Sequence, residues 1–115
     1  MRIEVRGRNT EVTEELREAI EQRFARVAKQ VSELASLEVE LTEERNPSIS
    51  DRQVAEATLY LKGVTLRAHE ASPEMIHSIH ELAEDIRRQV KRHRDKRRGR
   101  ARARRVVGRL RRREA

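Results

Sequence analysis

The residues with the clearest chemistry stand near the end of the chain, in the stretch RRQVKRHRDKRRGRARARRVVGRLRRR from Arg87 to Arg113. Residues 86–115 hold 16 basic and 2 acidic side chains, a net charge of +14, whereas residues 1–72 hold 11 basic and 14 acidic ones, a net charge of −3. In residues 86–115 arginine outnumbers lysine by 14 to 2. The planar guanidinium group forms paired hydrogen bonds with phosphate oxygens. The stretch therefore predicts binding to a polyanion, and nucleic acid is the favoured one.

A membrane surface and a helix dipole account less well for this charge. A helix that lies on a membrane needs bulky apolar anchors opposite its cations. The tail offers Val106, Val107 and Leu110 only, so we expect no membrane partner. Compensation of a helix dipole is worth about 0.3–1 kcal/mol and needs one or two cations, so it does not account for the stretch. A solvated tail without a partner stays open as an alternative.

Aromatic residues are nearly absent, because Phe24 and Tyr60 are the only two in the sequence. Proteins that read single-stranded RNA stack bases on platforms of several aromatic rings. One tyrosine does not make such a platform. We therefore expect contacts with the backbone of folded RNA or of a duplex, with little reading of base sequence.

The histidines and carboxylates that could support chemistry do not form a recognisable site. His77, His80 and Glu84 recur at steps of three and four, a spacing at which two histidines can hold a metal. The sequence places no further strong ligand beside them, and the chain has no cysteine and no phosphate-binding or nucleophile motif. We therefore predict no catalytic activity, no metal site, no cofactor and no small-molecule substrate.

The spacing of apolar residues predicts four strands. Alternation in Arg2–Arg8 predicts the first, and three later segments, LEVELTEE, VAEATLYLK and VTLRAHE, alternate in the same way. Gly63 separates the last two segments and predicts a tight hairpin turn. The glutamates of LEVELTEE are expected on a solvent-exposed sheet face rather than in an acid–base pair.

Two helices are predicted between and after these strands. Thr13 is suited to cap a helix from about Glu14 to Ser32. The apolar stripe that begins in this helix recurs at steps of three and four and consists of Leu16, Ile20, Phe24, Val27, Val31 and Leu34. Ser72 and Pro73 suit the start of a second helix that extends to Asp95. Its buried stripe consists of Met75, Ile79, Leu82, Ile86 and Val90, and the first helix breaker after it is Gly99.

The order β-α-β-β-β-α predicts an α+β fold, with two helices packed on one face of a four-stranded sheet. The opposite face would be polar and solvent-exposed. It would consist of Arg2, Glu4, Arg6, Glu38, Glu40, Thr58, Tyr60, Thr65, Arg67 and His69.

A chain of 115 residues is long enough for one domain. We predict that residues 1–96 form this domain and that residues 97–115 are a basic, arginine-rich tail or the start of a linker. The sequence has no apolar run that could span a bilayer and no apolar signal-peptide core. We therefore expect a cytoplasmic protein.

Several short motifs, in this order, resemble the ribosome hibernation-promoting factors and ribosome-associated inhibitors, also called the sigma-54 modulation family. The resemblance covers about residues 1–96. The motifs are GRN at 7–9, VT at 12–13 followed by LRE at 16–18, KG and TLRA within 62–68, E-S-EM within 70–75 and I-ELAEDIRRQVKRH within 79–93. Departures from the family pattern include Glu74-Met75-Ile76, where Asp-Met-Tyr is frequent, and His80, where an acid is frequent.

The resemblance implies a fold similar to double-stranded-RNA-binding domains and a place on the small ribosomal subunit, in the channel used by messenger and transfer RNA. Binding there would inhibit translation and keep ribosomes in hibernation during stress. The partners would be the small subunit and its ribosomal RNA. Together with the neighbouring cations of the same stretch, the RNA-binding residues would be Arg87, Arg88, Lys91, Arg92, Arg94, Lys96, Arg97 and Arg98.

The sequence leaves three alternatives open. The chain resembles either a short form of the family with a basic extension or the N-terminal part of a long form. A generic binder of structured RNA, without preference for the ribosome, is an alternative function. A protein-interaction module, in which a sheet edge or the first helix recruits the partner, is a further one.

Overall fold

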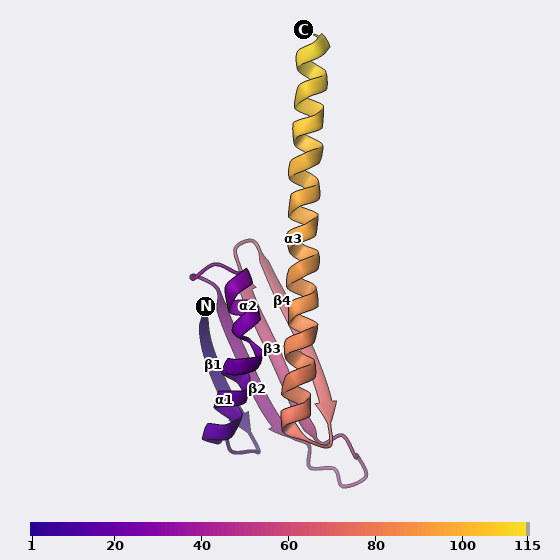
Figure 1. Cartoon of the computed structure of the whole chain (residues 1–115). Helices are drawn as coiled ribbons and strands as arrows, with labels where there is room; N and C mark the ends of the chain where they lie inside the picture. The colour runs from indigo at the N-terminus through magenta and orange to yellow at the C-terminus, as the bar shows by residue number, and fades with distance from the viewer. Residues whose placement is uncertain (115) are drawn as a thin grey trace.

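The computed structural model describes the backbone of residues 1–114 and the side chains of residues 1–100 and 102–104. Four strands and three helices follow one another as shown in Figure 1. In chain order they are β1 (Arg2–Arg8), α1 (Glu14–Arg23), α2 (Ala25–Gln30), β2 (Ser36–Glu43), β3 (Gln53–Leu61), β4 (Val64–Ser72) and α3 (Met75–Glu114).

The four strands form one sheet in the order β1-β2-β3-β4. Strands β1 and β2 are parallel, because the chain crosses over through α1 and α2 between them. The other two pairs are antiparallel, and β3 turns into β4 at Lys62 and Gly63, where Gly63 has a φ of +79°. The helices cover one face of the sheet (Figure 1), so the predicted α+β fold is confirmed.

The core lies between the helices and the covered face of the sheet. Along β2, Leu37, Val39 and Leu41 are at most 2% exposed, whereas the glutamates between them lie on the open face. The buried residues of α3 include all those of the predicted stripe, and Phe24 supplies the largest fully buried side chain. Alternation in the strands and the helical stripes therefore predicted the core correctly, with two exceptions. One is Ile76, which was expected to widen the buried stripe of the second helix and is 38% exposed.

The other exception is Leu34, which is 95% exposed although the stripe of the first helix predicted it to be buried. The helix does not reach Leu34. It is divided at Phe24, whose φ and ψ are −89° and 1°, and α2 ends at Gln30. The hydrogen bonds from Phe24 N–H to Ile20 O (2.9 Å) and from Ala28 N–H to Phe24 O (3.0 Å) continue across the division. Thr13 caps α1 as predicted, since its Oγ1 accepts from Leu16 N–H at 3.2 Å.

The start of α3 lies two residues later than predicted, at Met75 instead of Pro73. Ser72 is the last residue of β4 and is buried, and its hydroxyl accepts from Glu74 N–H at 3.3 Å. It also donates to Glu74 O at 2.6 Å and lies 2.7 Å from the hydroxyl of Ser78, which donates to Gln53 O at 2.6 Å. Because each hydroxyl has one proton, two of these three short contacts are hydrogen bonds at any moment. The serine pair joins β3 and β4 to the first turn of α3.

Replacement of Ser78 by alanine is expected to lower the free energy of unfolding by about 1–2 kcal/mol. The reason is that Gln53 O and the Ser72 hydroxyl lose a partner while they stay buried. Urea denaturation followed by circular dichroism measures the change. Exposed Ser50 provides the matched control, since Ser50→Ala removes a hydroxyl that water replaces. A loss for Ser78→Ala no larger than for Ser50→Ala would show that the serine pair does not stabilise this corner.

The end of α3 predicted at Asp95 is wrong, because the helix continues through Gly99 to Glu114. A glycine inside a helix costs about 1 kcal/mol relative to alanine, and the arginines and alanines around Gly99 are good helix formers. The 40 residues of α3 span about 60 Å at 1.5 Å per residue. Its C-terminal half projects beyond the sheet (Figure 1). The division into a domain of residues 1–96 and a tail of residues 97–115 stays a prediction.

Candidate nucleic-acid interface

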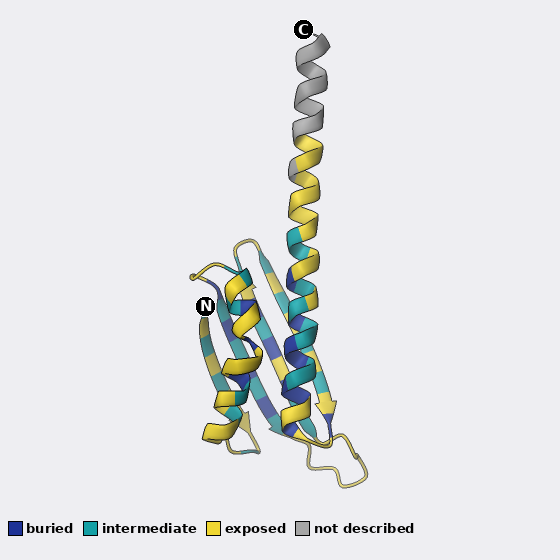
Figure 2. Ribbon diagram, in the orientation of Figure 1, coloured by how far each residue is buried: buried dark blue, intermediate teal, exposed yellow. Residues whose placement is uncertain are grey.

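A line of charged residues, four of them cations, follows the solvent side of α3 from the sheet into the projecting half of the helix. Its members recur at steps of three and four residues, so they lie on one side of an α-helix. We call this line the outer stripe, and it consists of Arg88, Lys91, Asp95, Arg98 and Arg102. All five side chains are exposed. Figure 2 shows that the described part of α3 beyond the sheet is mostly yellow, the colour of exposed residues. The stripe contains four cations and one acid, so it presents a positive surface.

The eight residues predicted to bind RNA do not all belong to this stripe. Arg92, Lys96 and Arg97 are exposed, but on other sides of α3. Arg92 and Lys96 line a groove of about 250 Å³ beside Val64 and Leu66 of β4. Arg97 lies on the side of α2, together with half-buried Arg94. The helix therefore presents cations to three sides rather than to one.

Arg87 is the predicted RNA-binding residue with an acidic partner in the structure. Its Nη2 lies 2.9 Å from Glu84 Oε2, one turn earlier in α3, and about a third of each side chain is exposed. The hydrogen bond from Arg87 holds the pKa of Glu84 below its usual range. A phosphate at Arg87 would have to compete with this carboxylate, which makes Arg87 a weaker candidate than Arg88 or Lys91.

The second and third turns of α3 are acidic, in contrast to its projecting half. Glu81 and Asp85 lie near Glu70 of β4. Burial and the charges of these two neighbours raise the pKa of Glu70. Among the described side chains, the positive surface therefore begins at Arg88 and continues to Arg104, which makes this part of α3 the candidate site for a polyanion.

Three exposed arginines of the projecting half, Arg100, Arg102 and Arg104, were absent from the predicted site. The predicted site stopped at Arg98, and the helix itself was predicted to end at Asp95, with Gly99 as the first helix breaker after it. A signal was present in the sequence, since no proline follows Gly99 and its neighbours favour a helix. Because α3 is continuous, these arginines extend the candidate interface beyond the sheet.

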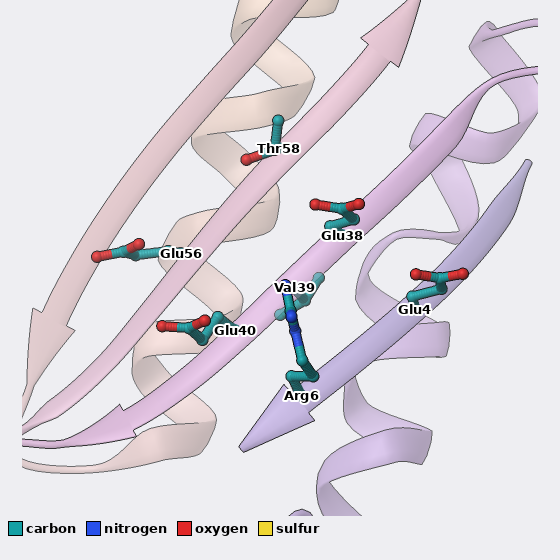
Figure 3. Close-up of a pocket in the computed structure, with 7 residues that line it drawn as sticks. All are labelled: Glu4, Arg6, Glu38, Val39, Glu40, Glu56 and Thr58. Carbon is teal, nitrogen blue, oxygen red and sulfur yellow. The ribbon is translucent and has the colours of Figure 1, made fainter. Parts of the chain in front are cut away.

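The open face of the sheet is polar, as predicted, but it does not suit a polyanion. Figure 3 shows Glu4, Glu38, Glu40 and Glu56 spread over three neighbouring strands, around a small hollow of about 100 Å³ that Arg6 also lines. Some of these carboxylates have partners on the same face. Arg2 Nη2 lies 3.0 Å from Glu4 Oε1, and Tyr60 Oη donates a hydrogen bond to Glu38 Oε2 at 3.3 Å. Four carboxylates would repel phosphate, so the candidate interface is the cationic surface of α3 and not this part of the open face.

The described part of the chain contains neither a metal-binding cluster nor a membrane-spanning helix. Within the described residues, no group of three His, Asp or Glu side chains is placed to hold a metal ion. In the same part of the chain, no helix combines the length and the hydrophobicity that crossing a bilayer requires.

Comparison with known protein families shows to which family the chain belongs. A family model described as "Sigma 54 modulation protein / S30EA ribosomal protein" matches residues 3–98. The chain belongs to this family. The match includes the buried half of α3 and all eight residues predicted to bind RNA. It ends just before the arginines of the projecting half.

Relatives in the sigma 54 modulation family agree with this assignment. A ribosome hibernation promoting factor of Salmonella typhimurium is 32% identical over 96 residues, which cover 84% of this chain and 96% of the relative. A ribosome hibernation promotion factor of Picosynechococcus is 30% identical over 97 residues, and the matched part spans half the length of that relative. The crystal structure of the Thermus thermophilus Protein Y N-terminal domain superposes with a TM-score of 0.70 at 25% identity, over 81% of this chain and 99% of that one.

Proposed function

We propose that this protein is a ribosome hibernation factor that binds the small ribosomal subunit in the channel used by messenger and transfer RNA. Its presence there blocks initiation and keeps ribosomes inactive under stress. The observation that supports the proposal most strongly is the exposed outer stripe of α3 on a domain of the sigma 54 modulation family. The names of the Salmonella and Picosynechococcus relatives support the link to ribosome hibernation.

The affinity is proposed to come from electrostatic contacts with the backbone of ribosomal RNA. Arg88, Lys91 and Arg98 are exposed on a backbone that is already helical, so binding has to order their side chains but not their backbone. Their mutual repulsion in the free protein would be relieved on binding, and counterions would leave the RNA. None of these contacts depends on base identity.

The distribution of charge gives the bound protein an orientation. The exposed side of α1 holds several carboxylates, whereas α3 holds the cations, and the two helices lie side by side on the same face of the sheet (Figure 1). Repulsion between RNA and the carboxylates of α1 would turn α3 towards the ribosomal RNA. The carboxylates in question are Glu14, Glu15, Glu18 and Glu21.

Sedimentation with purified small subunits tests the proposal. We expect the protein to sediment with them at 50 mM salt, and the affinity to fall by about 10³- to 10⁵-fold at 200 mM salt if six to ten phosphates are contacted. Occupied subunits are expected to lose the ability to bind initiator transfer RNA. If the protein stays at the top of the gradient at 50 mM salt, or if transfer RNA binds normally to occupied subunits, the proposed function is wrong.

A generic binder of structured RNA is the second candidate, and one observation favours it. The cations of α3 point to several sides, which suits phosphate contacts on many RNA surfaces. Competition separates the two candidates, because a ribosome-specific protein stays on small subunits when a random RNA duplex is added at the same phosphate concentration. Release by the duplex would favour the generic binder.

A further inference from the structure

Two exposed apolar side chains lie together in one cleft at the end of the sheet where α3 leaves it. Leu34 is 95% exposed and Tyr60 is 41% exposed, and both rank among the few large apolar side chains exposed to solvent. The cleft measures about 500 Å³. Its lining comes from three separate segments and consists of Ser32, Leu34, Ala35, Tyr60, Leu61, Lys62 and Arg97.

The position of Leu34 is fixed by its backbone. The side chain of Ser32 accepts from Leu34 N–H at 3.1 Å, and Ser32 O accepts from Ala35 N–H at 3.0 Å. Ala35 O in turn accepts from Arg2 N–H at 2.9 Å, which ties this turn to the edge strand β1. The turn therefore holds an apolar side chain in solvent, at a cost that a bound ligand would remove.

The ring of Tyr60 is accessible and anchored. Its hydroxyl donates to Glu38 Oε2 at 3.3 Å, which fixes the ring on the open face of the sheet. Its neighbours across the two adjacent strands are Ser36 and Thr65. Both are small, so the ring keeps an uncovered surface on which a flat group can stack.

The charged residues that line the cleft are positive. Lys62 and Arg97 line the cleft. A smaller cleft of about 140 Å³ shares both of them and adds His93 and Arg94. Among the described residues that line the two clefts there is no acid. An apolar floor beside several cations complements a flat, anionic ligand better than an apolar peptide.

We propose that this cleft binds the base of one unpaired nucleotide. The base stacks on Tyr60 against Leu34, and Lys62 and Arg97 contact the phosphates on either side of it. This inference rests on the proposed RNA-binding function and adds to it a contact with single-stranded RNA at the base of the projecting helix. Stacking of one base on an aromatic ring changes affinity by about 5- to 150-fold.

Nuclear magnetic resonance of the tyrosine ring tests the proposal directly. Tyr60 is the only tyrosine, there is no tryptophan, and Phe24 is fully buried, so the ring signals of Tyr60 are easily assigned. The probe is 5′-phosphorylated adenylyl-adenosine, and ribose 5-phosphate is the probe without a base. We expect upfield shifts of the Tyr60 ring protons with the dinucleotide and none with ribose 5-phosphate. Equal shifts with both probes would overturn the proposal, because they would indicate an anion site without stacking.

Matched variants connect the signal to the cleft. Leu34→Ala and Arg97→Ala are each expected to weaken dinucleotide binding at least about fivefold, a change at the lower end of what one base stack contributes. Ile49→Ala is the control, because Ile49 is 40% exposed in the loop between β2 and β3 and is expected to leave binding unchanged. Shifts of the Tyr60 signals with protein concentration alone would identify a second copy of the chain as the occupant and overturn the proposal.

Sedimentation of the same wild-type protein with small subunits separates this inference from the proposed function. If the protein sediments with subunits but the dinucleotide leaves Tyr60 unaffected, the cleft proposal is wrong and the proposed function stands. If the dinucleotide shifts Tyr60 but the protein does not sediment with subunits, the cleft proposal stands and the ribosomal function is wrong.

Discussion

Charge reversal along the solvent side of α3 is expected to lower the affinity for the small ribosomal subunit by at least about 100-fold, which corresponds to about 2.8 kcal/mol. The variant changes the four cations of the outer stripe to glutamate: Arg88, Lys91, Arg98 and Arg102. Each change removes a phosphate contact and brings a carboxylate towards the RNA, and like charges held close together cost several kcal/mol. Glutamate is a good helix former, so α3 itself is expected to stay intact. Binding to labelled small subunits at 50 mM salt measures the effect.

The chain offers a control with the same change in net charge. Four exposed cations of α1 and α2 are changed to glutamate in the control: Arg17, Arg23, Arg26 and Lys29. At moderate salt, charges separated from the RNA by more than about 10 Å are screened, so the control is expected to lose far less affinity. Equal losses in the two variants would show that total charge, and not the solvent side of α3, determines binding. Circular dichroism of both variants checks that they fold.

The sheet was predictable from the sequence, because side chains in a strand alternate between two faces. In β2, for example, Leu37, Val39 and Leu41 had to share one face, and burying them placed Glu38 and Glu40 in solvent. The stripe of α3 was predictable for the same kind of reason. A period of 3.6 residues leaves a single side of the helix apolar, and that side packs on the sheet.

The errors concern residues whose outcome depends on more than periodicity. Leu34 has the spacing of a buried residue, but the helix divides at Phe24 and ends before it, and the turn at Ser32 directs it into solvent. The helix was predicted to end at Asp95, before the helix breaker Gly99, but no neighbouring atom lies within 4 Å of the position that a side chain at Gly99 would take, and its neighbours in the sequence favour a helix. Turn geometry therefore explains the exposure of Leu34, and local helix propensity explains the continuation of α3 through Gly99.

The sequence could predict which cations form the candidate interface, but not on which side of α3 each of them lies. The sequence contains the cations, yet the side that each one takes depends on how α3 packs against β4 and α2. Arg92 therefore faces the groove beside β4, and Arg94 faces α2. The cleft at Tyr60 combines a loop, a strand end and a helix that are far apart in the sequence. No spacing of residues within one segment could have indicated it.

Replacement of Phe24 by alanine is expected to lower the free energy of unfolding by about 3–5 kcal/mol. Phe24 is fully buried, it is the only phenylalanine of the chain, and it lies at the division between α1 and α2. The rest of the core is aliphatic, so no second aromatic ring is available to fill the space that the truncation leaves. Because small domains have a total stability of about 5–15 kcal/mol, this loss is a large fraction of the total, and the variant is expected to unfold at a much lower urea concentration than the wild type. Urea denaturation measures the loss.

Two further variants test whether the loss of stability comes from the packing of Phe24 or whether the domain is destabilised by any truncation of an apolar side chain. Phe24→Leu keeps most of the buried volume and is expected to cost about 1–2 kcal/mol, because part of the cavity remains. Ile49→Ala removes an exposed side chain in the loop between β2 and β3 and is expected to change stability by less than about 0.5 kcal/mol. A loss for Phe24→Ala as small as that for Ile49→Ala would mean that α1 and α2 do not depend on Phe24 for their attachment to α3. In that case α1 and α2 would contribute little to the stability of the domain, which would come mainly from the packing of α3 on the sheet.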